Sequence, residues 1–264
     1  MHISKPLASG LTYSLGRSLY IPLTSRCNTL TLPQTRGPHF LLPAEVVSAL
    51  CRVRDAENQK EQWKHWCMYL DTSETPQLLP KAEEPVAALK GQTEEITDSE
   101  DGLQPSVNEL FMAVQENIGQ QEYQSVVFAG EGEPTLRPIA LVALAKKLKN
   151  IQSPPLRLTT NGLMSNDPMR SHVLQSNAIS SVSVALMTHD SDQYDELMKP
   201  VIPDDATNTR SHERVCQFIQ EALTAGLAVE VTAVEHPDVD KHQTEQYAAS
   251  LGVTEPVRWR SYFP

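Results

Sequence analysis

Short apolar runs alternate with longer amphipathic segments along most of the chain. Six runs rich in apolar and β-branched residues predict strands, at residues 19–24, 125–129, 156–160, 181–186, 228–234 and 257–262. The segments between them have apolar positions at helical spacing, at residues 44–53, 107–118, 138–149, 167–175, 211–225 and 241–251. Strands that alternate with helices form βα units, so we expect an α/β fold, a partial (βα)6 barrel with its ligands at the carboxyl ends of parallel strands.

Local signals define the ends of three of these helices. Ser106 and Glu109 have the spacing of a capping box, which predicts a helix beginning at Val107. Gly226 and Gly252 follow the last apolar positions of two other helical segments and predict their ends.

One segment interrupts the alternation. Residues 71–102 contain nine acidic residues and two lysines, no aromatic residue, and three prolines. Such a composition favours a mobile segment over a packed one. We therefore expect residues 1–54 to form the first βα unit, 55–105 an insertion that is acidic and mobile from residue 71, and 106–264 the remainder of the barrel. The acidic insertion is the surface that we expect a protein partner to use.

Charge and composition exclude several classes of function. The chain has 264 residues and a net charge of -11, which argues against a nucleic-acid partner, because phosphate binding relies on clustered lysine and arginine. Its four cysteines, at positions 27, 51, 67 and 216, show no CxxC pair that would suggest a disulfide framework or a zinc site. No apolar run is long enough to cross a bilayer. We expect a soluble cytoplasmic protein, with organelle targeting by the acid-free residues 1–44 as the alternative.

The residues that follow the predicted strands resemble a known family. Cys27 follows the first strand, the loop Gly130-Glu131-Gly132-Glu133-Pro134 follows the second, Thr160-Asn161-Gly162 ends the third, and Ser183 lies in the fourth. In this order they resemble the radical SAM superfamily, and most of all its TatD-linked group. The resemblance covers nearly the whole chain outside residues 55–105.

The resemblance implies a [4Fe-4S] cluster, and the sequence departs from the motif that would hold it. In the family a CxxxCxxC loop after the first strand binds three irons, and S-adenosylmethionine binds the fourth. Counted from Cys27, the second and third positions are Thr31 and Gln34. Neither offers the thiolate that cluster iron takes as its usual ligand, so the standard cluster lacks two of three protein ligands.

The same resemblance implies a set of cofactor-binding residues. Glycines let a backbone approach a ligand closely, and a carboxylate accepts hydrogen bonds from an ammonium group. The positions implied to line an S-adenosylmethionine pocket are Gly130, Glu131, Gly132, Glu133, Thr160, Asn161 and Ser183. Cys27 is the metal ligand if a cluster binds.

Charged residues at the strand ends add two weaker hypotheses. A metal or acid/base site is one interpretation of the His and Asp side chains after the fourth and fifth predicted strands, namely His189, Asp190, His236, Asp238 and Asp240. A second hypothesis is that arginines meet a carboxylate or phosphate, and its candidates are Arg36, Arg137, Arg258 and Arg260.

Two functions of different classes follow, and the sequence leaves open whether the chain is an enzyme. In the first, the chain is a radical SAM-like pseudoenzyme, a binding or scaffold protein without the standard cluster that keeps an S-adenosylmethionine pocket. In the second, it is an active enzyme that holds its cluster unconventionally and cleaves S-adenosylmethionine to a 5'-deoxyadenosyl radical. The sequence has no P-loop, no GxSxG elbow and no HExxH motif to support other chemistry.

Overall fold

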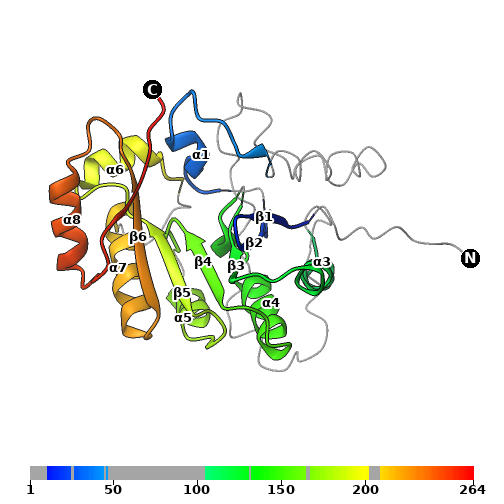
Figure 1. Ribbon diagram of the computed structural model, residues 1–264. Coiled ribbons are helices and arrows are strands. Elements are labelled where there is room, and N and C mark those ends of the chain that lie inside the picture. The colour runs from blue at the N-terminus through cyan, green and yellow to red at the C-terminus, as the bar shows by residue number, and fades with distance from the viewer. Residues whose placement is uncertain are drawn as a thin grey trace, which may run out of the picture.

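One curled sheet of seven strands forms the centre of the computed structural model, which describes residues 11–24, 27–44, 46, 105–130, 132–164, 167–201 and 209–264 (Figure 1). The strands lie in chain order: β1 (Tyr13–Leu15), β2 (Ser18–Ile21), β3 (Ser125–Phe128), β4 (Leu156–Thr160), β5 (Ser181–Ala185), β6 (Ala228–Val234) and β7 (Arg258–Arg260). β1 pairs with β2 antiparallel, and β2 to β7 are parallel. The expected α/β partial barrel with six parallel strands is thereby confirmed.

Helices lie along the outer side of this sheet and beyond the carboxyl ends of its strands (Figure 1). In the described part of the chain they are α1 (Leu32–Thr35), α3 (Val107–Gln120), α4 (Pro138–Asn150), α5 (Asp167–Leu174), α6 (Ser191–Met198), α7 (Ser211–Thr224) and α8 (Lys241–Ser250), with a 3-10 turn, η5 (Pro134–Leu136). α3 packs on β2, and α7 packs on β5 and β6. The capping box is present, because Ser106 Oγ accepts from Glu109 N and Glu109 Oε2 accepts from Ser106 N.

The structure adds elements that the pattern did not predict. β1 joins β2 through the two-residue turn Gly16-Arg17, and its three residues are too few to give a periodic signal. α6 is also new, and its eight residues include only two buried ones, Tyr194 and Met198. The predicted helix at 44–53 and the insertion at 55–105 lie almost wholly outside the described residues.

The two faces of the sheet differ in polarity. Side chains that face the helices are apolar and buried, among them Leu19, Phe128, Leu158, Val184 and Val231. Alternation places polar residues on the opposite, inner face: Tyr20, Arg157, Thr159, Ser183, Glu230, Thr232, Arg258 and Arg260. A polar inner face on an otherwise apolar sheet is a place where a ligand can be recognised.

The chain segment after α1 pairs with the C-terminal tail. Phe263 N donates to Arg36 O at 2.7 Å, and His39 N donates to Phe263 O at 3.4 Å. The Phe40 and Phe263 rings lie 5.5 Å apart. Gly37 has φ +101°, and a Cβ there would lie 2.1 Å from Phe263 O, so only glycine permits this approach. In Figure 1 the blue α1 region lies beside the red C-terminal end.

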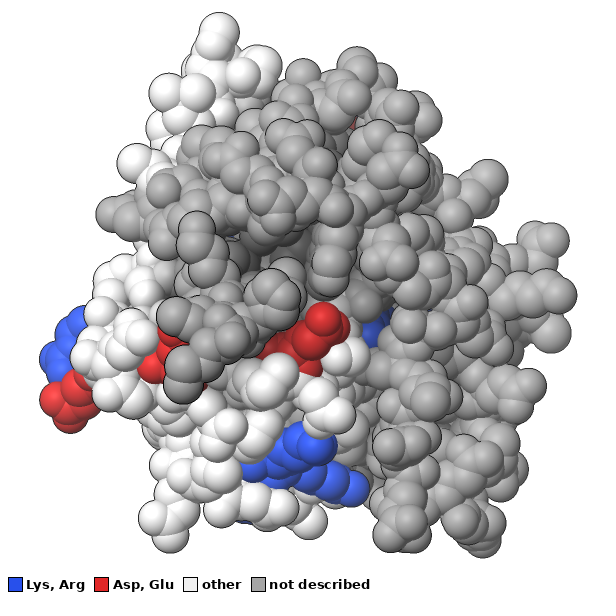
Figure 2. Space-filling view, turned by 90° about the vertical axis from the view of Figure 1, so that its right-hand side faces the viewer, with Lys and Arg blue, Asp and Glu red and all other residues white. Residues whose placement is uncertain are grey.

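The described part of the side that Figure 2 shows carries small groups of acidic and basic side chains, and one acidic and one basic group adjoin at its left edge. None of the helices within the described ranges is long and apolar enough to cross a membrane.

Candidate functional site

The carboxylate of Glu133 joins the ends of two neighbouring strands. It accepts four hydrogen bonds: Oε1 from Thr135 N at 3.0 Å, Thr135 Oγ1 at 2.7 Å and Thr160 Oγ1 at 2.7 Å, and Oε2 from Asn161 N at 2.7 Å. Glu133 is 4% exposed. Burial raises the pKa of this carboxyl group, and the four hydrogen bonds oppose that rise. Every one of these donors belongs to the protein, so Glu133 holds the loop after β3 against β4.

Asn161 continues the network to the loop after β2. Its Nδ2 donates to Asn28 Oδ1 at 2.6 Å and lies 3.3 Å from Thr29 Oγ1. Its Oδ1 accepts from Leu163 N at 3.0 Å. Cys27 Sγ is 3.4 Å from Thr29 Oγ1 and 4.0 Å from Asn161 Nδ2. The structure therefore brings Cys27, Glu133, Thr160 and Asn161 together, as their places at the strand ends predicted.

Cys27 is held as a thiol. Its side chain is buried, and burial followed by the nearby charge of Glu133 raises its pKa to about 11. At neutral pH the thiolate, which is the nucleophile and the metal ligand, is therefore rare. Tyr194 from α6 lies near both groups: burial, then the charges of Cys27 and Glu133, raise the pKa of its phenol. The Tyr194 hydroxyl is buried and has no hydrogen-bond partner in the described structure.

Thr31 and Gln34, the other two positions of the loop, are bound to each other. Thr31 N donates to Gln34 Oε1 at 2.8 Å, and Thr31 Oγ1 donates to the same oxygen at 2.9 Å. This arrangement caps α1, whose first turn contains Pro33. Both side chains therefore serve the start of a helix.

The glycine loop after β3 runs close to the end of β2. A Cβ on Gly130 would lie 2.5 Å from Pro22 Cβ, so the backbone there needs glycine for close approach. Gly132 is described in the same loop, and Glu131 lies outside the described residues.

Ser183 belongs to a different group from the buried network. Its Oγ donates to Glu230 Oε1 at 2.7 Å on the inner face of the sheet. The same carboxylate oxygen lies 2.8 Å from Arg258 Nη2 and 3.8 Å from Arg157 Nη2. Glu230 was missed in the sequence, although a lone acid in the otherwise uncharged strand β6 was the signal that could have found it.

Two further arginines approach this charged group. Arg36 Nε donates to Ser261 O at 2.7 Å, next to Arg260 in the chain, and its guanidinium lies over the rings of Phe40 and Phe263. Burial, followed by the charges of Arg258 and Arg36, lowers the pKa of Arg260 to about 10. Arg260 Nε is buried without a hydrogen-bond partner among the residues that the structure describes.

Arg137 lies apart from the other arginines. It is 5% exposed, and its Nη1 donates to Leu23 O at 2.8 Å and to Pro105 O at 2.9 Å. These bonds tie the end of β2 to the start of α3. Arg137 thus helps to hold the backbone, and the hypothesis that it also meets an anion stays a prediction.

Most of the His and Asp side chains considered for a metal or acid/base site make contacts with residues nearby in the chain. Asp190 Oδ1 accepts from Gln193 N and caps α6, and Asp240 Oδ1 accepts from Gln243 N and caps α8. His236 Nδ1 lies 3.6 Å from Asp238 Oδ2. In the ranges that the structure covers, no group of three His, Cys, Asp or Glu side chains is arranged to hold a metal ion.

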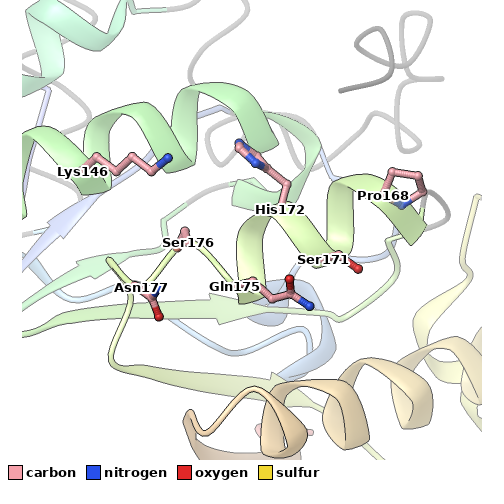
Figure 3. A pocket seen from close by; sticks show the side chains of 7 residues that line it. All are labelled: Lys146, Pro168, Ser171, His172, Gln175, Ser176 and Asn177. Atoms are coloured by element: carbon pink, nitrogen blue, oxygen red, sulfur yellow. The ribbon is translucent and has the colours of Figure 1, made fainter. Parts of the chain in front are cut away.

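A pocket of about 520 Å³ lies in the outer helix layer, away from the strand ends (Figure 3). It is lined by Lys146, Pro168, Ser171, His172, Gln175, Ser176 and Asn177. Burial, and then the charge of Lys146, lower the pKa of His172. None of the sequence-predicted site residues lines it.

Comparison with known proteins gives a loose structural likeness only. No protein-family model and no curated protein matches the sequence. Among solved structures, SuiB of Streptococcus suis bound to S-adenosylmethionine has a TM-score of 0.48 at 17% identity over 60% of this chain and 34% of its own. Native anSMEcpe with bound AdoMet has a TM-score of 0.42 at 15% identity, over 59% and 43%.

Archaeal TYW1 has a TM-score of 0.42 at 11% identity, and the match covers 90% of this chain and 62% of that one. The chain thus spans about a third of SuiB and less than two thirds of TYW1. At these identities and TM-scores the likeness assigns neither a family nor an activity.

Proposed function

We propose that this chain is a radical SAM-like protein without the standard [4Fe-4S] site, a pseudoenzyme that binds a small molecule or a partner and retains an S-adenosylmethionine pocket. The sequence motifs that resemble the family support this, together with the meeting of Cys27, Glu133, Thr160 and Asn161 at one edge of the sheet. The finer likeness to the TatD-linked group rests on the sequence alone.

The observation that carries the proposal is the pairing of Thr31 with Gln34. These side chains stand where the motif requires two cysteines, and they cap α1 instead. The first ligand position, Cys27, is a buried thiol with a pKa of about 11. A cluster needs several thiolates that converge on it, and this donor set supplies one thiol. The residues present do not fit the cluster, so no step of a reaction is assigned to it.

In this proposal the backbone of the loop after β3 contacts the cofactor, and the carboxylate of Glu133 does not. Because protein donors already occupy both oxygens of Glu133, its part in the proposal is to position the loop and Asn161. The backbone of Gly130 to Gly132 would meet the methionyl end of S-adenosylmethionine, and the side of β5 near Ser183 would meet the ribose. Without iron to chelate the cofactor, its affinity depends on these polar contacts.

Reconstitution with iron and sulfide under anaerobic conditions tests the loss of the cluster. Iron and acid-labile sulfide are counted per chain on the wild type, on Cys27→Ala, and on Cys216→Ala as the matched control, since Cys216 is also a buried free cysteine but belongs to α7 and not to the loop. We expect the wild type and both variants to bind well below one iron per chain. About four irons per wild-type chain, lost in Cys27→Ala and kept in Cys216→Ala, would overturn the proposal in favour of an active enzyme with an unconventional cluster.

Calorimetric titration of the iron-free chain with S-adenosylmethionine tests the pocket. Saturable binding that Gly130→Ala abolishes is expected, because the added Cβ would push the loop from Pro22. The matched control is Gly119→Ala in α3, where an added Cβ meets nothing within 4 Å. Absence of binding to the wild type would remove the cofactor pocket from the proposal.

A further inference from the structure

The inner face near β7 concentrates positive charge in a chain that is acidic as a whole. Arg36, Arg258 and Arg260, which we call the arginine cluster, come together there although the chain has a net charge of -11. Strand register sets two of them: Arg258 pairs with Thr232 and Arg260 with Val234, so both face the same side as Glu230. The third reaches the site because its Nε binds Ser261 O.

The nearby negative charge does not balance this group. Glu230 faces the cluster and lies 2.8 Å from Arg258, and the same oxygen also receives Ser183 and approaches Arg157. Among the side chains that the structure describes, four arginines face one carboxylate here. Like charges held together disfavour the unliganded state, and a bound anion relieves that repulsion.

One donor of the cluster is also unused. Arg260 Nε is buried and has no hydrogen-bond partner in the described structure. Buried donors in folded proteins are almost always paired, so the partner of this one is something other than the described residues. Guanidinium donors form a planar fork that matches the two oxygens of a carboxylate or a phosphate.

We propose that the arginine cluster is an oxyanion-binding subsite, and that the ligand handled by this protein carries a carboxylate or phosphate group that docks on Arg258 and Arg260 at the inner face. The proposal deepens the proposed function and rests on it, because the subsite lies on the same inner face as Ser183. The subsite is distinct from the strand-end network of Cys27, Glu133 and Asn161.

Side-chain NMR of the full chain tests the subsite directly. Arginine Nε–Hε signals are followed while inorganic phosphate, and in a second series succinate, is titrated into ¹⁵N-labelled protein. We expect the Arg260 signal to shift saturably with at least one of the two anions, and the responding anion identifies the class of ligand. A response to neither would overturn the proposal.

Variants with opposite changes in charge should change the affinity for the anion in opposite directions. Arg260→Gln and Arg258→Gln should each weaken the binding of the responding anion about 10- to 100-fold, as expected for the loss of a charged hydrogen bond. Glu230→Gln should strengthen it about two- to fivefold, because it removes a carboxylate that competes with the ligand for Arg258. Arg210→Gln is the matched control: Arg210 is exposed, binds Asp192 at 2.7 Å, and should leave the affinity unchanged.

Titration of the same variants with S-adenosylmethionine separates this inference from the proposed function. Anion binding that depends on Arg260 supports the subsite even if S-adenosylmethionine does not bind the wild type, in which case only the proposed cofactor pocket fails. Equal loss of phosphate and S-adenosylmethionine binding in Arg260→Gln would overturn the inference, since the cluster would then belong to the cofactor pocket. Should Arg260→Gln fail to fold, the opposite effects of Arg258→Gln and Glu230→Gln decide the matter alone.

Discussion

The hydroxyl of Thr160 donates to Oε1 of Glu133 over 2.7 Å, and this bond links the end of β4 to the loop after β3. The donor comes from a strand end and the acceptor from a loop 27 residues earlier in the chain. Among the described residues the carboxylate gathers three further bonds there, all from neutral donors. The site therefore depends on neutral donors for its shape.

Replacing Glu133 with Gln should destabilise the protein by about 1–3 kcal/mol, because an amide NH₂ would face donors that now meet an oxygen. The free energy of unfolding in urea measures this loss. Glu235→Gln is the control, since Glu235 pairs with Lys241 at 2.6 Å on the surface and should change the stability by less than about 1 kcal/mol. Equal effects of the two changes would contradict the structural role of Glu133.

Cys27 should make the stability of the protein fall in alkali. Its pKa is raised from 9.0 to about 11 in the folded state, so between these values the folded chain holds a proton that the unfolded chain has lost. The stabilising contribution is complete below pH 9 and is lost as the pH rises through 11, by about 2–3 kcal/mol. Urea unfolding between pH 8 and 11 measures this contribution. The free energy of unfolding of the wild type minus that of Cys27→Ala should fall as the pH rises. A constant difference would show that the thiol has no raised pKa.

Gly37→Ala should break the pairing of the C-terminal tail. Its Cβ would lie 2.1 Å from Phe263 O at a positive φ, so the tail must move. We expect the Phe263 amide to lose protection from hydrogen exchange and the melting temperature to fall. Gly119→Ala in α3 has open space around it and should leave the tail unaffected while stabilising the helix by about 0.5–1 kcal/mol.

Arg137→Gln should cost stability and leave anion binding unchanged. Arg137 is buried and donates to Leu23 O and Pro105 O, and removing it leaves those carbonyls without this donor, at about 1–3 kcal/mol. Phosphate titration and urea unfolding on one preparation separate the two effects. A loss of phosphate affinity in this variant would place Arg137 with the arginine cluster.

The sequence predicted those parts of the structure that rest on local signals. The start of α3 followed from Ser106 and Glu109, because a capping box involves residues three apart. The parallel strands followed from short apolar runs, which stay apolar when both faces of a strand are covered.

The positions that depend on distant partners could not be predicted. Tyr194 reaches Cys27 and Glu133 only through the fold, from a short helix whose pattern gave no signal. The bond between Ser183 and Glu230 could not be predicted either, because it depends on the register that sets the two strands side by side. The arginines likewise separate into a cluster and a buried Arg137 only once strand register is known.

The pairing of the tail with the segment after α1 has a consequence for folding kinetics. Arg36 and Ser261 are 225 positions apart in the chain, so their contact closes a very long loop. Closing such a loop costs chain entropy before the contact adds stability, so we expect the contact to form late in folding. The arginine cluster, which needs Arg36 held at Ser261, would then be assembled only when the last strand and its tail are in place.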